Sequence, residues 1–257
     1  MITDDSRSHG AHRTSMQNLI IDIGNSSAKV ALFEGDTMIE DFRVGHEELY
    51  QLLTGKALHR AIHAAIVSSV IPLNEEVEQA IRALPYPCLR MSSTLKMPFS
   101  IAYETPKTLG PDRLAAVAEA WGQRPGNNLL VIDIGSAITY DIITSDGIYR
   151  GGNISPGIGM RFKALNHFTG KLPLVSKEGI RTNIGVTTET AIREGVLQGV
   201  SYEIEGYIRA YSIKFPQLLI FLTGGGTFLL DNQTKSRTFV DSLLVVKGLN
   251  RILALNQ

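Results

Sequence analysis

The sequence has little cysteine, no net charge and no long apolar run. Its single thiol, Cys88, has no second cysteine with which to form a disulfide or a metal site. Lys and Arg together number 25, and so do Asp and Glu, so no overall field draws the chain to nucleic acid or to an anionic membrane. No stretch approaches the roughly 18 apolar residues of a membrane span, and no signal-peptide pattern is present. These absences predict a cytoplasmic protein without a nucleic-acid or membrane partner.

Three common nucleotide-binding motifs are also missing. The sequence contains no G-x-x-x-x-G-K-[ST] loop, no strand and helix joined by G-x-G-x-x-G, and no protein-kinase catalytic loop. A P-loop or a Rossmann fold is therefore excluded on its own motif.

One pattern does occur twice. Residues 19–36 read LIIDIGNSSAKVALFEGD, and residues 129–147 read LLVIDIGSAITYDIITSDG. The two stretches align without a gap at an offset of 111 residues, so that Asp22 matches Asp133 and Gly24 matches Gly135. The offset is too long for a solenoid repeat, and it indicates a duplicated α/β domain.

The repeated Asp-Ile-Gly has two interpretations. Asp and Gly are ordinary turn residues, so a single copy is explained by a tight hairpin. Glycine also lets backbone amides approach phosphate oxygens, and small polar side chains add donors without bulk. Because two unrelated hairpins would not be expected to share one order of residues, the duplication favours a pair of phosphate-binding turns whose aspartates handle cations.

A break between the copies is predicted at the turn-forming stretch GQRPGNN, residues 122–128. We expect domains at 16–122 and 123–257, preceded by a disordered extension or tag at 1–15. Apolar periodicity and capping residues predict the elements. They are strands within 19–23, 30–33, 38–44, 61–70, 87–91, 129–147 and 217–223, helices at 47–55, 74–84, from about 112, at 161–168, within 182–212 and at 240–255, and a glycine-rich loop at 149–160.

Six segments together resemble the type III pantothenate kinases. They are DIGNSSAK (22–29), LGPDR (109–113), VIDIGSAITYD (131–141), GGNISPGIGM (151–160), IGVTTETAI (184–192) and TGGG (223–226). The resemblance places the chain in the acetate and sugar kinase, Hsc70 and actin superfamily. It implies two duplicated actin-like (ribonuclease H-like) α/β domains, with mixed sheets flanked by helices and a nucleotide cleft between them. It also implies a homodimer that converts ATP and pantothenate to 4'-phosphopantothenate, the first step toward coenzyme A.

The resemblance assigns roles to individual residues. Asp112 corresponds to the general base, Asp133 to the ligand of a monovalent cation, K⁺ or NH₄⁺, and Asp22 to the group that binds the magnesium-nucleotide, directly or through water. The ATP phosphates are assigned to Asp22, Ile23, Gly24, Asn25, Ser26, Ser27, Ala28, Lys29, Gly135 and Ser136. Pantothenate is assigned to Tyr103, Gly110, Pro111, Asp112, Arg113 and Thr188.

The chain departs from the family pattern at four positions. Ser26, Ser136 and Ile138 stand where the family commonly has Thr, and Thr187 stands where it has Asn. Ile138 cannot donate a hydrogen bond, so the departure predicts an altered phosphate contact.

Other interpretations of these residues remain open. Asp112 could serve as a helix cap, and Arg113 could form a surface ion pair of small value. The apolar stripe Val196, Val200 and Ile204 predicts a core or dimer interface. The same fold could also belong to a non-catalytic regulator or to a kinase of another small acceptor.

Overall fold

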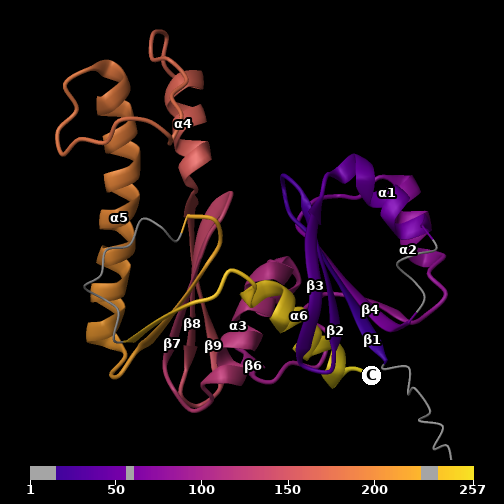
Figure 1. The fold of residues 1–257 in the computed structure, drawn as a ribbon. Coiled ribbons are helices and arrows are strands. Elements are labelled where there is room, and N and C mark those ends of the chain that lie inside the picture. Colours follow the sequence, from indigo (N-terminus) through magenta and orange to yellow (C-terminus); the bar gives the residue numbers. More distant parts are fainter. Residues whose placement is uncertain (1–15, 56–60, 227–236) are drawn as a thin grey trace, which may run out of the picture.

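The computed structural model describes residues 16–55, 61–226 and 237–257, so the predicted extension at 1–15 lies outside the described residues. The strands form two mixed sheets (Figure 1). The first has the order β3 (Thr37–Val44), β2 (Ala28–Glu34), β1 (Gln17–Ile23), β4 (Ile62–Ser69) and β5 (Cys88–Arg90). The second has the order β11 (Thr238–Val240), β10 (Leu219–Thr223), β7 (Leu129–Ile134), β8 (Ala137–Thr144), β9 (Ile148–Pro156) and β6 (Ser100–Ile101).

Both sheets are built by the same sequence of pairings. In each, the first two hairpins are antiparallel, and the strand that follows a helix then pairs in parallel with the first strand. β1 and β7 therefore hold equivalent central places. The predicted duplication of an α/β unit is confirmed.

Helices cover both faces of each sheet, which explains the nearly continuous apolar runs of β1, β4 and β7. α1 (His46–Thr54) and α2 (Glu75–Arg82) pack on the outer face of the first sheet, where Asn74 accepts a hydrogen bond from the Val77 amide and caps α2 as predicted. α4 (Ile158–His167) and α5 (Thr188–Lys214) lie on the outer face of the second sheet and extend beyond it in Figure 1. In α5 the stripe Val196, Val200 and Ile204 is buried against that sheet, so these residues belong to the core.

Two helices fill the space between the sheets. α3 (Pro111–Gln123) contacts β7 and β8 of the second sheet and also β4 of the first, while α6 (Leu244–Leu255) contacts β1, β2 and β4 of the first. Gly248 of α6 allows the two helices to cross closely, since a Cβ at this position would lie 1.8 Å from the Ala115 carbonyl oxygen of α3. One apolar core thus joins the inner faces of both sheets. No helix in the described ranges is long and apolar enough to span a membrane.

The structure corrects two expected elements. Most of the predicted glycine-rich loop at 149–160 is strand β9, because Gly151, at φ +90°, accommodates a register shift and Gly152 lies against Tyr140, whose carbonyl oxygen would be 1.7 Å from an added Cβ. The predicted closing helix at 240–255 begins only at Leu244, since Val240 pairs in β11. The domain boundary between residues 122 and 123 stays a prediction. β6, which precedes this boundary in the sequence, pairs with β9 of the second sheet.

Candidate active site

The two Asp-Ile-Gly turns meet across the gap between the sheets. Asp22 is the penultimate residue of β1 and Asp133 that of β7, and each strand ends in a tight turn. The Gly24 amide donates to the Ser27 carbonyl at 3.0 Å, and the Gly135 amide donates to the Ala137 carbonyl at 3.0 Å. Both turns line one cavity of about 320 Å³, so the fold brings the duplicated motif together in space.

This cavity, called here the phosphate cavity, contains most of the residues predicted to bind ATP. It is lined by Asp22, Gly24, Asn25, Ser26, Ser27, Lys29, Arg43, Asp133, Gly135, Ser136, Thr223, Gly224, Gly225, Ser242 and Val245. The Lys29 ammonium group donates to the Ser242 carbonyl at 2.8 Å and so links the two halves of the chain. Ile23 and Ala28, which the resemblance also assigned to ATP, are buried in the apolar core of the first sheet.

Arg43 was not anticipated from the sequence. It lies on β3 directly opposite Lys29 on β2, so both cations line the phosphate cavity. The alternation of side chains along 37–44 indicates a strand. Only the register of the β2–β3 hairpin shows that Arg43 lies opposite Lys29. The arrangement supplies two positive charges to an anionic ligand.

Close packing at Gly224 completes the cavity. Its φ is +88°, and a Cβ there would lie 2.5 Å from Asp133 Oδ1. Only glycine therefore lets the turn after β10 lie against the carboxylate of the second motif.

The aspartates of the two motifs are buried close to other carboxylates, which disfavours their charged forms. Burial, reinforced by the Asp112 charge, raises the pKa of Asp22 to about 6. Burial together with the charges of Asp112 and Asp22 raises the pKa of Asp133 to about 7. Asp22 Oδ1 is buried and has no hydrogen-bond partner among the described residues. A cation fits these carboxylates, although the described residues include no cluster of three His, Cys, Asp or Glu that could hold a metal by themselves.

A second cavity of about 410 Å³ adjoins the first and shares Asp22, Asp133 and both glycine turns with it. We call it the acceptor cavity. Four residues that the resemblance assigned to the substrate, Tyr103, Gly110, Asp112 and Arg113, line it together with Thr139, whereas Pro111 does not. The structure thus brings the predicted base to the edge of the phosphate cavity.

Asp112 lies in the first turn of α3, where Gly110 is the N-cap and Pro111 is the first helical residue. The Asp112 carboxylate accepts a hydrogen bond from the Arg113 amide at 2.8 Å, so it is not the N-cap itself. A Cβ at Gly110 would lie 2.7 Å from Asp112 Oδ1, so a larger residue there would displace the Asp112 carboxylate. Burial is the main cause that raises the pKa of Asp112.

Arg113 does not form the surface ion pair that was one interpretation of the sequence. It is 5% exposed, and its Nη2 lies 2.7 Å from Oδ1 of Asp141, which is 1% exposed. The Tyr149 hydroxyl donates to the same carboxylate oxygen at 2.6 Å. Asp141 was overlooked in the sequence, where a carboxylate inside an apolar strand was the available signal.

The departure at Ile138 has a structural reason. Along β8 the side chains alternate, so Ala137 and Thr139 line the acceptor cavity while Ile138 is fully buried in the core of the second sheet. A hydroxyl at this position would face the core, so the predicted change in a phosphate contact is not supported. Thr187 is the N-cap of α5 and accepts a hydrogen bond from the Thr190 amide.

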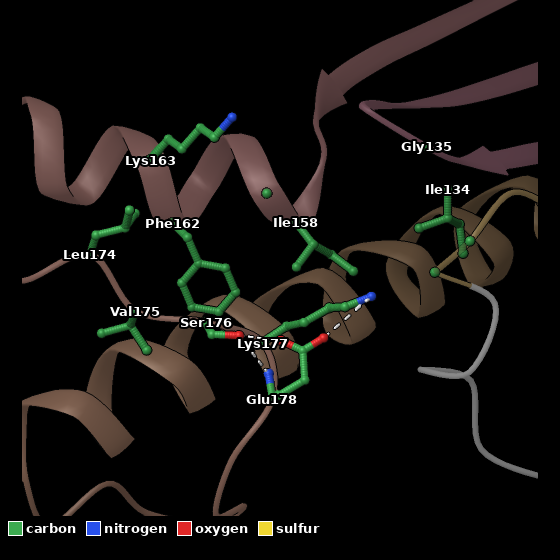
Figure 2. Close-up of a pocket in the computed structure, with 13 residues that line it drawn as sticks. Ile134, Gly135, Ile158, Phe162, Lys163, Leu174, Val175, Ser176, Lys177 and Glu178 are labelled. Atoms are coloured by element: carbon green, nitrogen blue, oxygen red, sulfur yellow. Dashed lines mark hydrogen bonds and ion pairs between the residues drawn. The ribbon is translucent and has the colours of Figure 1, made fainter. Parts of the chain in front are cut away.

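A third cavity of about 560 Å³ adjoins the phosphate cavity at Gly135 and Gly225 (Figure 2). Its walls are mainly apolar. They include Ile134, Ile158, Phe162, Leu174 and Val175, with Lys163, Ser176, Lys177 and Glu178 at the polar positions. Figure 2 shows the Phe162 ring of α4 pointing toward the loop that carries 174–178. An apolar pocket joined to a cavity that carries Lys29, Arg43 and two glycine turns can hold a base and its phosphates.

Thr188 is not brought to the same place. It lies at the start of α5 and lines a separate cavity of about 870 Å³ between α4 and α5, with Arg161, Phe168 and Ile192 among its neighbours. It is absent from the residues that line the phosphate and acceptor cavities. Within one chain, therefore, the substrate residues predicted from the sequence are divided between two locations.

Comparisons with known proteins agree with this geometry. A family profile described as type III pantothenate kinase matches residues 18–210. A type III pantothenate kinase of Bacteroides fragilis is 52% identical over 239 residues, which cover 93% of this chain and 98% of that protein. Among solved structures, a Campylobacter jejuni protein assigned to the Baf family of transcriptional activators has a TM-score of 0.60 at 25% identity and covers 92% of this chain and 97% of its own. A Listeria monocytogenes protein described as an N-acetylmannosamine kinase shares the actin-like fold, with a TM-score of 0.54 at 14% identity over 93% of this chain and 99% of its own.

Proposed function

The chain belongs to the type III pantothenate kinase family, and from this membership we infer that it phosphorylates pantothenate with ATP, the first step of coenzyme A biosynthesis. The observation that carries the site assignment is the meeting of the two Asp-Ile-Gly turns beside Asp112. A single cysteine and the use of ATP suit a cytoplasmic enzyme.

Three features of the cleft support a proposed position for the nucleotide. The ATP phosphates lie between the two glycine turns, close to Lys29 and Arg43, where amides and cations surround the phosphate cavity. The adenosine occupies the apolar pocket behind Gly225. Asp22 would hold Mg²⁺ directly or through water, and the bound ion would supply neutralisation of phosphate charge.

The position of Asp112 supports a proposed site for the acceptor. Phosphoryl transfer needs an in-line hydroxyl and stabilised charge more than strong bond formation, so positioning dominates catalysis. Pantothenate in the acceptor cavity would direct its primary hydroxyl to the Asp112 carboxylate and toward the shared wall with the phosphate cavity. Asp112 takes the proton as the attacking oxygen becomes more acidic, and burial raises the pKa of this base toward the working range.

The first test is the reaction itself. Purified protein with ATP, Mg²⁺ and pantothenate should form 4'-phosphopantothenate, and turnover should be higher with K⁺ than with Na⁺. Binding of ATP without phosphorylation of pantothenate in either salt would contradict the proposed activity and would favour a regulator or a kinase of another acceptor.

We expect Asp133→Ala to abolish activation by the monovalent cation. The ratio of kcat in K⁺ to kcat in Na⁺ should fall to about one, because the carboxylate that compensates the ion is removed. In the wild type, the apparent affinity for K⁺ should weaken as the pH falls below about 7. The pKa of Asp133 is about 7, so at lower pH a proton competes with the ion for the carboxylate. The control is Asp146→Ala. Asp146 is an exposed carboxylate in the turn between β8 and β9. Normal K⁺ activation of the Asp133 variant would refute this role.

A homodimer would resolve the separation of Thr188 from Asp112. The stretch from α4 to the start of α5, residues 158–188, exposes several large apolar side chains, which a second copy could cover. They are Met160, Phe168, Ile180, Ile184 and Val186. In this arrangement Thr188 of one chain contacts pantothenate in the cleft of the other.

We expect Thr188→Ala to raise the KM for pantothenate about 10-fold, the effect of one lost hydrogen bond. Hybrid dimers with Asp112→Asn then test the arrangement. If Thr188 acts across the dimer, mixing the two variants creates one intact site per hybrid and restores turnover at low pantothenate concentration. If it acts within its own chain, no hybrid site is intact and mixing restores nothing.

A further inference from the structure

Asp141 is a buried carboxylate to which the proposed reaction gives no role. It lies on β8, 1% exposed, and accepts hydrogen bonds from two atoms of Arg113, Nε at 3.0 Å and Nη2 at 2.7 Å. The Tyr149 hydroxyl on β9 donates a third at 2.6 Å. Such contacts fix the plane of the guanidinium group, because two of its nitrogens are tied to one carboxylate.

The other edge of Arg113 is left for the acceptor cavity. A guanidinium carries five N–H donors, and the contacts with Asp141 use only those on one side. Arg113 lines the acceptor cavity together with Tyr103, whose side chain also interacts with the guanidinium, and the donors that neither partner uses can serve a ligand there. The ion pair therefore orients Arg113 without consuming all of its donors.

The charges of the acceptor cavity show what such a ligand would be. Three carboxylates line it, those of Asp22, Asp112 and Asp133, and Arg113 is the only Lys or Arg among its described lining residues. A carboxylate on the substrate would be repelled by the three acids. Arg113 is the one lining side chain that can compensate its charge.

We propose that Asp141 is a positioning residue that acts through Arg113 to fix where the acceptor's carboxylate binds. The inference rests on the proposed function, since it takes pantothenate as the acceptor. Asp141 holds the guanidinium toward the cavity, and Tyr149 in turn holds Asp141. The hydroxyl end of the acceptor then reaches Asp112 because the carboxylate end is fixed.

Loss of Asp141 would let the Arg113 guanidinium turn away from the acceptor's carboxylate. It would not make Arg113 a better ligand for that carboxylate. A buried cation without its partner turns to another carboxylate, and the neighbouring Asp112 is within reach of its charge. The guanidinium would leave the acceptor carboxylate, and the hydroxyl would lose its alignment with the base. Misplacement of this kind costs about 100-fold in rate.

The test separates acceptor binding from nucleotide binding. We expect Asp141→Asn to lower kcat/KM for pantothenate about 100-fold while the KM for ATP stays within about twofold. Tyr149→Phe, which keeps the ion pair, should have the same pattern at about 10-fold and guards against misfolding of the first variant. Asp146→Asn, which breaks the exposed pair with Arg150 on the same hairpin, should leave both constants unchanged. Equal losses for ATP and pantothenate in both buried-site variants would overturn the proposal.

A double-mutant cycle tests action through Arg113. In an Arg113→Met background, Asp141→Asn should change kcat/KM for pantothenate by less than about threefold, because the group it positions is already gone. The double variant should also melt at a higher temperature than Arg113→Met alone, which leaves a buried carboxylate unpaired. A further 100-fold loss in the double variant would show an independent role and refute the proposal. Failure of the wild type to phosphorylate pantothenate would instead refute the proposed function.

Discussion

Replacement of Asp112 by Asn is expected to lower kcat by roughly two to four orders of magnitude, the usual range for loss of a general base. The amide has nearly the same size, and its oxygen can still accept the hydrogen bond from the Arg113 amide, so the start of α3 should be preserved. What is lost is the ability to take a proton from the attacking hydroxyl. The KM for ATP should change little, because Asp112 lies in the acceptor cavity and not among the residues that line the phosphate cavity.

The pH profile gives a second measure of the same role. Because burial raises the pKa of Asp112, the wild-type kcat/KM for pantothenate should begin to fall at a pH above the ordinary range of an aspartate. Asp112→Asn should lack that acidic limb. An Asn variant with near-normal turnover at all pH values would remove Asp112 from the reaction and leave it a structural residue of the first turn of α3.

Replacement of Asp22 by Asn is expected to lower kcat/KM for ATP by about three orders of magnitude, since it removes the negative charge that holds the magnesium-nucleotide. Its melting temperature should stay the same or rise above pH 6. The pKa of about 6 means that the folded state disfavours the charged form, so a neutral amide relieves a cost at neutral pH. Loss of activity together with preserved stability distinguishes a functional residue from a structural one.

A matched control for this variant lies in the next turn of the same sheet. Asp36 is exposed in the β2–β3 turn and lines neither cavity, so Asp36→Asn should leave kcat/KM for ATP unchanged. If Asp22→Asn bound ATP with wild-type affinity and turned it over at the wild-type rate at subsaturating Mg²⁺, the metal-nucleotide assignment would be wrong.

The duplicated fold could be predicted from the sequence because its signals are local. Apolar runs, the Asp-Ile-Gly turns and the Asn74 cap each require only neighbouring residues. The glycine-rich segment at 149–160 was misinterpreted for the opposite reason. Gly152 is needed because Tyr140 of the adjacent strand comes so close, and only the pairing of β8 with β9 reveals this.

The site shows the same division. Asp22 and Asp133 are visible in the sequence because their motif is repeated. Arg43 and Asp141 are not, because each reaches the cleft through strand register or through a partner far along the chain. Thr188 was placed with the substrate by resemblance alone, and within one chain it lines the cavity between α4 and α5 instead of the acceptor cavity.

The most direct test of the central claim is a crystal structure of the wild-type protein with pantothenate, Mg²⁺, K⁺ and a non-hydrolysable ATP analogue. The account predicts the analogue's phosphates between the turns at Gly24 and Gly135. It places the pantothenate carboxylate on Arg113 and the primary hydroxyl about 2.6–3.2 Å from the Asp112 carboxylate. A complex with the phosphates outside the two turns, or with the hydroxyl directed away from Asp112, would contradict it.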